Sequence, residues 1–373
     1  MARIIGSPLR YIQGADEIKN FAEDIKDFGT KYFLVVDKAI EHIVLPDLQK
    51  SFSQSKIKTY KHELFTGECS MVEIERVLKI AKEYGADCII GIGGGKCADT
   101  SKVVAYKMKA SCVIFPTTAS SDAPCSHSAV IYKENGEFDQ YYYPFKSPDV
   151  VVVDTAIIAK APVRLLVSGI ADALATYFEA RSAYASYRDV NEWKGKPGIT
   201  SMAIAKVCYD TLLADAVKAK VAAENKVVTE ALENIVEANT YLSTIGFESG
   251  GLGAAHSIQD ALSIIPEVHK MLHGEKVAFG TLVHLFLENA CNDEIKTVMK
   301  LCYQLGLPMC LRDLNIVNID KDTLMKVAKK ATGPGVPMGN MPFKVTADAV
   351  YSAILVADQM GRQFKEKMDR KLR

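Results

Sequence analysis

The feature that most constrains the fold is an alternation of short apolar runs with amphipathic stretches over roughly the first 160 residues. The apolar runs are five to seven residues long, which suits strands buried on both faces. Between them, the stretch 71–84 places apolar side chains at helical spacing. Strands that alternate with helices predict a parallel sheet in an α/β domain. The expected strands are 32–37, 87–93, 112–116 and 150–154.

From residue 161 onward, apolar positions recur at helical spacing in one stretch after another. The chain of 373 residues is also long for a single hydrophobic core. We therefore expect two domains, an α/β domain at 1–160 and an all-helical domain at 161–373. A loop is expected at the Gly- and Pro-rich passage 332–342, and Thr346 is placed to cap the helix that follows. The expected helices are 163–184, 200–223, 227–242 and 347–367.

One segment of the first domain departs from the parallel pattern. Residues 129–132 and 140–143 are short runs of aromatic and β-branched residues on either side of Asn135-Gly136. Asn-Gly favours a tight turn between antiparallel strands. The segment therefore predicts a hairpin beside the sheet.

Composition excludes several classes of function. Lys plus Arg and Asp plus Glu both number 45, so no net charge favours nucleic acid or an acidic membrane surface. No apolar run approaches the length of a membrane span, and the first residues are too short and broken for a signal peptide. The nine cysteines form no Cys-x-x-Cys pair, which excludes a cysteine zinc ribbon. We expect a cytoplasmic protein without nucleic-acid or membrane partners.

A glycine-rich segment, Gly91–Thr100, follows an expected strand and opens a helix. Exposed amides and the positive end of a helix dipole favour a phosphate there, and glycines let it approach the backbone. The segment is not a Walker A motif, because Ile90 and Cys97 occupy its glycine and Ser/Thr positions. It is not the Rossmann motif either, because Lys96 replaces the last glycine. A simple tight turn would need one glycine rather than four, so we expect phosphate binding.

Two further features favour a dinucleotide. Asp37 ends an expected strand, where an acid can bind a ribose hydroxyl and repel a 2′-phosphate, although an ordinary turn aspartate is the alternative. The hydroxyl-rich segment 117–126 follows the strand 112–116. Ligands of open sheets bind at the carboxyl ends of parallel strands, although hydroxyl-rich loops are also common on surfaces.

The second half contains a candidate metal site. Three of the seven histidines, His256, His269 and His273, lie within eighteen residues. Imidazole is a ligand for zinc and other divalent metals, and catalytic sites usually have three protein ligands and an open position. Asp172 is the best third candidate, because a carboxylate in an apolar helical run is costly to bury alone. An ion pair would satisfy the same need, and His269 is a competing ligand or a supporting group.

In this order, the motifs resemble the iron-containing alcohol dehydrogenase superfamily and, within it, the glycerol dehydrogenase branch. The resemblance covers nearly the whole chain, from Asp37 and Lys96, through Asp122 and Gly169-Ile-Ala-Asp172, to His256 and His273-Gly-Glu-Lys. It implies a dehydroquinate synthase-like arrangement, with a dinucleotide-binding α/β domain and a helical metal domain. The active site would lie in the cleft between them.

The resemblance also assigns roles by position. Asp172, His256 and His273 would hold the metal, and Asp122 would contact the substrate, so these four would form the catalytic set. Superfamily members that use iron typically have a further histidine four residues after the aspartate. Thr176 stands there, which favours zinc over iron or another divalent metal. The residues expected to bind NAD are Asp37, Gly94, Gly95, Lys96, Cys97, Ala98, Asp99, Thr117, Thr118, Ala119, Ser120, Ser126, Ser128 and Tyr132.

The activity implied by the resemblance is reversible, NAD-dependent oxidation of a secondary hydroxyl of glycerol or a related small polyol. Alternatives are a related dehydrogenase for another small alcohol or for 2-oxo acids, and a sugar-phosphate cyclase related to dehydroquinate synthase. A metal-storing or structural protein would leave the phosphate turn unexplained. Kinship also implies a homo-oligomer, and an octamer is one form it would take. Gly253 and Gln259 replace the more usual alanine and histidine, which bears on the substrate pocket.

Overall fold

The computed structural model describes residues 2–55, 57 and 59–372, and the chain forms two compact units. The sheet unit comprises Ser7–Leu166 and Val221–Thr244. The helical unit comprises Met1–Gly6, Val167–Lys220 and Ile245–Arg373. The predicted fold class, a parallel α/β part and an all-helical part, is confirmed. The predicted division after residue 160 stays a prediction, and the compact units differ from it mainly because Val221–Thr244 packs with the sheet unit.

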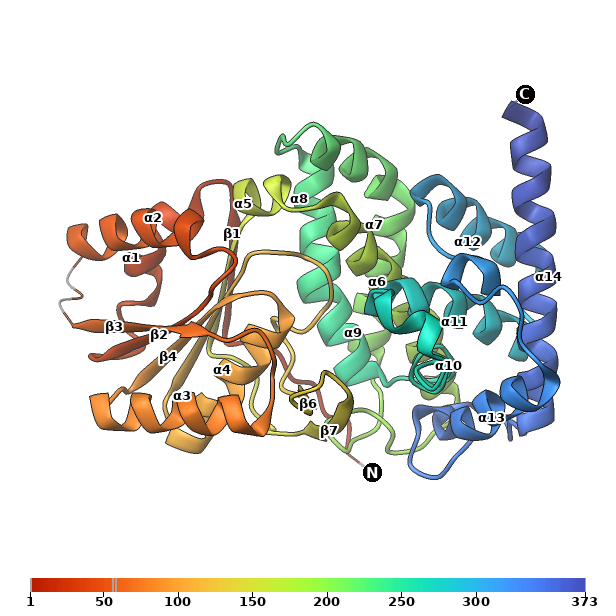
Figure 1. The fold of residues 1–373 in the computed structure, drawn as a ribbon, viewed down its shortest axis with the longest axis horizontal. Helices are drawn as coiled ribbons and strands as arrows, with labels where there is room; N and C mark the ends of the chain where they lie inside the picture. Colours follow the sequence, from red (N-terminus) through yellow and green to blue (C-terminus); the bar gives the residue numbers. More distant parts are fainter. Residues whose placement is uncertain (1, 56, 58, 373) are drawn as a thin grey trace. The chain divides into compact units, whose positions relative to one another are not determined.

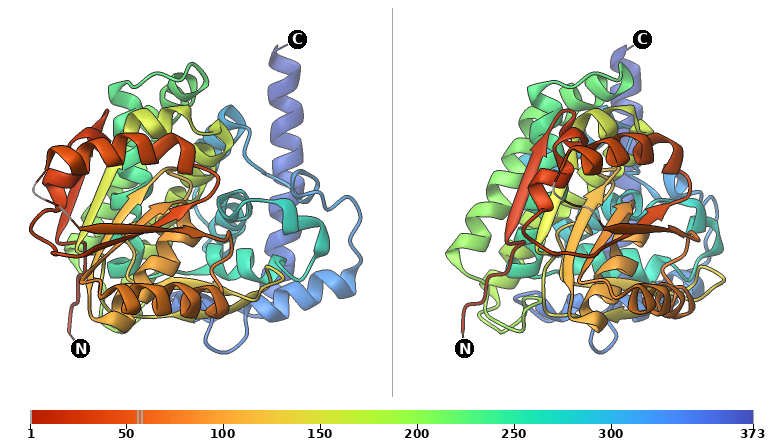
Figure 2. Two further views of the ribbon diagram at one scale, coloured as in Figure 1. Left: turned by 60° about the vertical axis from the view of Figure 1, so that its left-hand side comes forward. Right: turned by 90° about the vertical axis from the view of Figure 1, so that its left-hand side faces the viewer.

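The described part of the sheet unit contains one parallel sheet of six strands. Their order across the sheet is β1 (Arg10–Gly14), β8 (Val150–Asp154), β5 (Ser111–Pro116), β4 (Cys88–Gly93), β2 (Tyr32–Asp37) and β3 (Tyr60–Phe65). In Figures 1 and 2, α1 (Phe21–Ile25) and α2 (Glu41–Gln54) lie over one face of the sheet, and α3 (Met71–Tyr84) and α4 (Gly95–Met108) lie over the other. β4 and β8 are buried along their whole length, which explains their unbroken apolar sequences.

The connections reverse direction between β2 and β4. From β2 the chain continues to β3 at one edge, whereas from β4 it continues to β5 on the other side. Ligands of open parallel sheets bind outside the carboxyl ends of the strands at such a reversal. Asp37 ends β2 and Gly93 ends β4, so both predicted dinucleotide features lie at this point.

The predicted hairpin is confirmed. β6 (Ala129–Tyr132) pairs antiparallel with β7 (Phe138–Tyr142), and Gly136 in the turn has φ +83°, a value that favours glycine. The predicted cap of the last helix is also confirmed, because the Thr346 hydroxyl accepts a hydrogen bond from the amide of Ala349 at 3.2 Å.

The remaining elements are helical. The sheet unit also contains η1 (Glu17–Lys19), α5 (Thr155–Lys160), α8 (Glu230–Glu237) and a π-helical turn, η2 (Ala238–Leu242). None of the described helices has both the length and the apolar character needed to cross a membrane. The helices that lie wholly or mostly in the helical unit are α6 (Val163–Ala185), α7 (Ile199–Glu224), α9 (Ser243–Gly250), α10 (Ala254–Leu262), η3 (Pro266–Lys270), α11 (His273–Leu287), α12 (Asn292–Leu305), η4 (Leu311–Leu314), α13 (Lys321–Ala331), η5 (Pro337–Asn340) and α14 (Ala347–Leu372).

Candidate active site

The helical unit brings Asp172, His256 and His273 to one point. Asp172 Oδ1 lies 3.4 Å from His256 Nε2 and 3.1 Å from His273 Nε2. One ligand atom from each of the three lies within 4.8 Å of the others. Donors around a tetrahedral ion with bonds near 2.1 Å are about 3.4 Å apart. The cluster therefore has the dimensions of a three-ligand metal centre.

Small residues allow the three helices that carry these side chains to pack closely. A Cβ on Gly274 would lie 1.9 Å from the Ser168 carbonyl oxygen, so α11 contacts α6 directly beside His273. A Cβ on Gly280 would lie 2.4 Å from the carbonyl oxygen of Ala255, so α11 also contacts α10 beside His256. The glycines and alanines that the sequence places around the candidate ligands thus set the distances between their helices.

Burial and charge in the cluster favour a cation. The side chain of Asp172 is only 1% exposed, that of His256 12% and that of His273 44%, so the cluster is accessible from the side of His273. Burial alone would raise the pKa of the Asp172 carboxyl, but His273 and His256 outweigh this effect and hold the pKa below its ordinary value. Within the described residues, neither Asp172 oxygen accepts a hydrogen bond of good geometry, although both are buried.

Glu179 completes the surroundings of His256, and the sequence reasoning missed it. It lies on α6, seven residues after Asp172, and its side chain is fully buried. His256 Nδ1 lies 2.6 Å from Glu179 Oε2, and the amides of Gly253 and His256 each donate to Glu179 Oε1 at 2.9 Å. Burial opposes the charge of Glu179, but His256 holds the pKa of this carboxyl below its ordinary value. The spacing of two helical turns from Asp172 is a signal that the sequence offered.

The donor set fits a divalent metal. One carboxylate and two imidazoles are typical ligands of a catalytic zinc site, and an outer carboxylate behind one imidazole is a common companion. His269, the competing candidate, lies elsewhere: it is exposed on η3, and its Nε2 donates to the Ser263 carbonyl at 3.0 Å. Thr176, at the position where the resemblance implies a histidine in iron-using members, is buried on α6 between Asp172 and Glu179.

The glycine-rich turn lies between β4 and α4 in the sheet unit. A Cβ on Gly93 would lie 2.8 Å from Asp37 Cβ and 2.9 Å from Cys97 Cβ, so glycine is required by close packing. The packing also brings Asp37 next to the turn. Gly94 is the N-cap of α4, and no described side chain caps this end of the helix. The first amides of α4 are therefore available to a phosphate.

Around this turn, the predicted NAD-binding residues fall into two groups. A Cβ added to Gly94 would lie 3.8 Å from Thr118 Oγ1, and a Cβ added to Gly95 would lie 3.7 Å from Ser121 Oγ. The Thr118 and Ser120 hydroxyls lie 3.3 Å apart, and Thr117 donates its amide to Gly93. Cys97, Ala98, Asp99, Thr117 and Ala119 are buried in the protein. Direct contact of any of the predicted residues with a cofactor stays a prediction.

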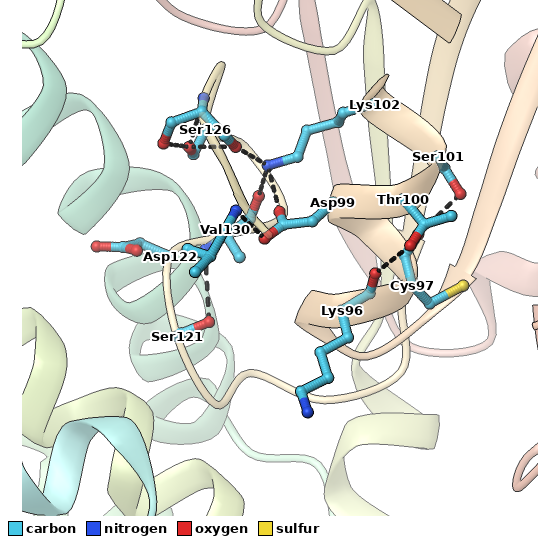
Figure 3. Close-up of polar contacts among 12 residues, drawn as sticks. Lys96, Cys97, Asp99, Thr100, Ser101, Lys102, Ser121, Asp122, Ser126 and Val130 are labelled. Atoms are coloured by element: carbon cyan, nitrogen blue, oxygen red, sulfur yellow. Dashed lines mark hydrogen bonds and ion pairs between the residues drawn. The ribbon is translucent and has the colours of Figure 1, made fainter. Parts of the chain in front are cut away.

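Figure 3 shows how a buried ion pair holds the loop after the turn. Lys102 Nζ lies 2.8 Å from Asp99 Oδ1 and donates to the carbonyls of Ala123 at 2.9 Å and Ser128 at 2.5 Å. Asp99 Oδ2 accepts the amide of Val130 at 2.9 Å. Asp99 and Lys102 thus fix the loop that carries Ser126 and Ser128, which are expected to bind NAD. Lys102 was missed by the sequence reasoning.

Several side chains that are expected to bind NAD contact other side chains of the protein. The Ser126 and Ser128 hydroxyls lie 2.7 Å apart. Lys96 Nζ lies 2.7 Å from Glu68 Oε2 and 4.8 Å from the centre of the Tyr132 ring. Lys96 and Tyr132 therefore contact each other, and a contact of either one with NAD stays a prediction.

Asp122 is held by the segment that follows α8. Ser243 Oγ donates to Asp122 Oδ2 at 3.1 Å, and Thr244 Oγ1 donates to the Asp122 carbonyl at 2.7 Å. In the π-helical turn η2, Asn239 Nδ2 donates to the carbonyls of Ala119 at 2.9 Å and Leu166 at 3.2 Å. π-helical turns occur frequently at functional sites. These contacts explain why Val221–Thr244 belongs to the sheet unit. No sequence pattern predicted them.

A parallel sheet with a glycine-rich turn, joined in one chain to an Asp–His–His cluster, is the combination expected of a metal-dependent dehydrogenase. The family described as iron-containing alcohol dehydrogenase matches residues 8–155. A glycerol dehydrogenase of Citrobacter freundii is 45% identical over 364 residues, which cover 98% of this chain and 99% of that protein. A glycolaldehyde reductase of Halobacterium salinarum is 40% identical over 98% of this chain and 100% of that protein. The crystal structure of glycerol dehydrogenase from Schizosaccharomyces pombe has a TM-score of 0.94 at 36% identity and covers 99% of this chain and 93% of that one.

The chain belongs to the iron-containing alcohol dehydrogenase family. The family resemblance inferred from the motifs is confirmed, including its branch, because the similarity extends over nearly the full length of both chains. The protein is an oxidoreductase, and its family implies a dinucleotide and a divalent metal. The roles of individual site residues stay predictions.

Proposed function

We propose that the protein reversibly oxidises the secondary hydroxyl of glycerol, or of a related small polyol, with NAD and a zinc ion held by Asp172, His256 and His273. The observation that carries the proposal is the convergence of these three side chains in a chain 45% identical to a glycerol dehydrogenase. The accessible side at His273 is where a substrate oxygen would approach.

A divalent metal at this cluster would polarise a substrate oxygen as a Lewis acid, and NAD would accept the hydride. The open amides at Gly94 and Gly95 would bind the pyrophosphate. Asp37 would bind the adenosine ribose and reject a 2′-phosphate. Asp122, fixed by Ser243, would orient the remaining substrate hydroxyls.

The choice of zinc rests on Thr176, since the extra imidazole of iron-using members is missing on this turn of α6. The family resemblance supports a homo-oligomer, which is part of the proposal, and an octamer is one form it would take. A cytoplasmic location is part of the proposal, because all nine cysteines are present as thiols, which suits a reducing compartment.

A second candidate function is reduction of a small hydroxyaldehyde or other small carbonyl compound. It is favoured by the 40% identity to a glycolaldehyde reductase over almost the whole chain. Both candidates use the same cluster and the same turn, so only the substrate distinguishes them. Rates with glycerol and NAD, compared with rates for glycolaldehyde or 2-oxobutyrate and NADH, would rank them.

The central experiment measures NAD reduction with a panel of small polyols before chelation, after chelation and after addition of Zn²⁺ or Fe²⁺. We expect glycerol to be oxidised, chelation to abolish the activity, and Zn²⁺ to restore it better than Fe²⁺. Full activity in the metal-free protein would refute a catalytic metal, and better recovery with Fe²⁺ would refute zinc.

Variants test the ligand set. His273→Ala should lose the bound metal and nearly all activity, as should Asp172→Ala and His256→Ala. His269→Ala is the matched control, because this histidine is exposed and lies outside the cluster. A ligand variant that keeps a stoichiometric metal and full activity would remove that residue from the set.

A further inference from the structure

We infer that Glu179 is a positioning residue for the metal centre: it orients the His256 ring, and it does so by also fixing the start of the helix that carries it. The inference rests on the proposed function, because it concerns the ligand role of His256. Nothing in the family motifs pointed to this position. The contacts of one fully buried carboxylate carry it.

Glu179 and the candidate ligand Asp172 are carried by the same helix, α6. Asp172 and Glu179 are seven residues apart, which is close to two helical turns, so both lie on one face of α6. The His256 ring spans the distance between them, with Nε2 3.4 Å from Asp172 and Nδ1 2.6 Å from Glu179. One helix therefore contacts both nitrogens of the same imidazole.

Glu179 also selects the tautomer of His256. An ionised carboxylate only accepts hydrogen bonds, so the ring proton of neutral His256 must be on Nδ1. The lone pair of Nε2 then faces Asp172 and His273, which is the form that a metal ligand requires. Without the carboxylate, the two tautomers would compete, and no hydrogen bond to Nδ1 would hold the orientation of the ring.

Glu179 also holds the backbone around His256. The other oxygen, Glu179 Oε1, accepts the amides of Gly253, the N-cap of α10, and of His256, in its first turn. No side-chain cap is provided by Gly253 itself, so Glu179 performs that function from α6. A Cβ on Gly253 would lie 3.4 Å from Glu179 Cγ, an ordinary van der Waals distance, so the side chain of Glu179 lies directly against this residue. The same carboxylate thus fixes both the backbone and the ring of His256.

The test is Glu179→Gln, with metal affinity measured by competition with a chromophoric chelator. Glutamine has nearly the same shape and can still accept the two amides. Its NH₂ group would donate to Nδ1, however, and move the ring proton to Nε2. We expect metal affinity to fall about 10- to 100-fold, and the visible spectrum of the Co²⁺ form to change. Thermal unfolding of the metal-free variant should match that of the wild-type protein.

A double variant shows whether Glu179 affects metal affinity through His256 or through the structure of the site in general. In a His256→Ala background, Glu179→Gln should cause no further loss of metal affinity, because the ring it orients is gone. Glu294→Gln is the matched control: it removes a partly buried carboxylate that lies 2.8 Å from Arg181 and does not contact the cluster. This control should bind metal as the wild-type protein does.

Three results would overturn the inference. The first is wild-type metal affinity in Glu179→Gln. The second is that Glu179→Gln lowers metal affinity as much in the His256→Ala background as it does alone. If Glu179→Gln does not fold, Glu179→Asp decides, because a side chain shorter by one methylene keeps the charge but cannot hold the ring and both amides. Unchanged affinity in Glu179→Asp would then be the third. Failure of the proposed function would look different. In that case His256→Ala alone would bind metal as tightly as the wild-type protein does.

Discussion

The packing of α11 on α6 predicts that a single methyl group at Gly274 disrupts the metal centre without altering any ligand. Gly274 follows His273 directly, at the start of α11. Its missing Cβ would lie 1.9 Å from the carbonyl oxygen of Ser168, which is one helical turn before Asp172 on α6. The backbone carbonyl cannot rotate away as the end of a flexible side chain can, so the two helices must separate.

The required movement follows from the distances. Ordinary van der Waals contact begins at 3.4 Å, so the separation must grow by more than about 1 Å. His273 moves with the end of α11, whereas metal–ligand bonds tolerate only about 0.2 Å. We therefore expect Gly274→Ala to lower metal affinity at least about tenfold. Overpacking should also lower the free energy of unfolding by about 1–3 kcal/mol.

Gly339→Ala is the control for this prediction. Gly339 belongs to the same unit, but its Cβ would meet no atom within 4 Å, so stability and metal affinity should not change. Chelator competition gives the affinity, and thermal unfolding of both metal-free variants gives the stability. Wild-type affinity in Gly274→Ala would show that helix contact at Ser168 does not set the position of His273.

Three further predictions concern the sheet unit. Asp37→Gly should raise the use of NADP relative to NAD, measured as the ratio of kcat/KM values, and an unchanged ratio would refute the ribose role. Ser243→Ala removes the hydrogen bond to Asp122 and should raise KM for glycerol several-fold with metal content unchanged; equal KM values would contradict it. Burial, followed by Glu17, raises the pKa of Asp24 to about 6, so the folded state keeps this proton longer than the unfolded state. Stability should then fall between about pH 4 and pH 6, and Asp24→Asn should remove about 1 kcal/mol of that fall in urea unfolding, a value reduced for partial exposure.

The fold was predictable where burial is complete. β4 and β8 are buried on both faces, so their sequences are continuous apolar runs, and both were predicted to within one residue. β1 and β3 were missed because they are the two edges of the sheet. An edge strand has one unpaired side and is partly exposed, so it carries polar side chains and lacks the apolar run.

The candidate site was predictable to the extent that motifs are local. His273 and Gly274 are adjacent, and Asp172 lies within a recognisable stretch of α6, so both were found. Asn239 and Ser243 were not found, because their role depends on which loop they contact, more than a hundred residues away. A buried amide or hydroxyl in a helix has no sequence pattern that names its partner.

Helix packing explains both which features of the candidate site could be predicted from the sequence and which could not. The cluster needs three side chains on three helices to agree within a fraction of an ångström, and helix packing sets such distances through the smallest residues at the contacts. Gly274 and Gly280 are visible in the sequence, but only the structure shows that they face Ser168 and Ala255. Glu179 adds a second constraint, because it ties α10 to α6 through hydrogen bonds rather than through packing. Loss of either constraint should therefore weaken metal binding while all three ligands remain, which a test of the ligands alone would never reveal.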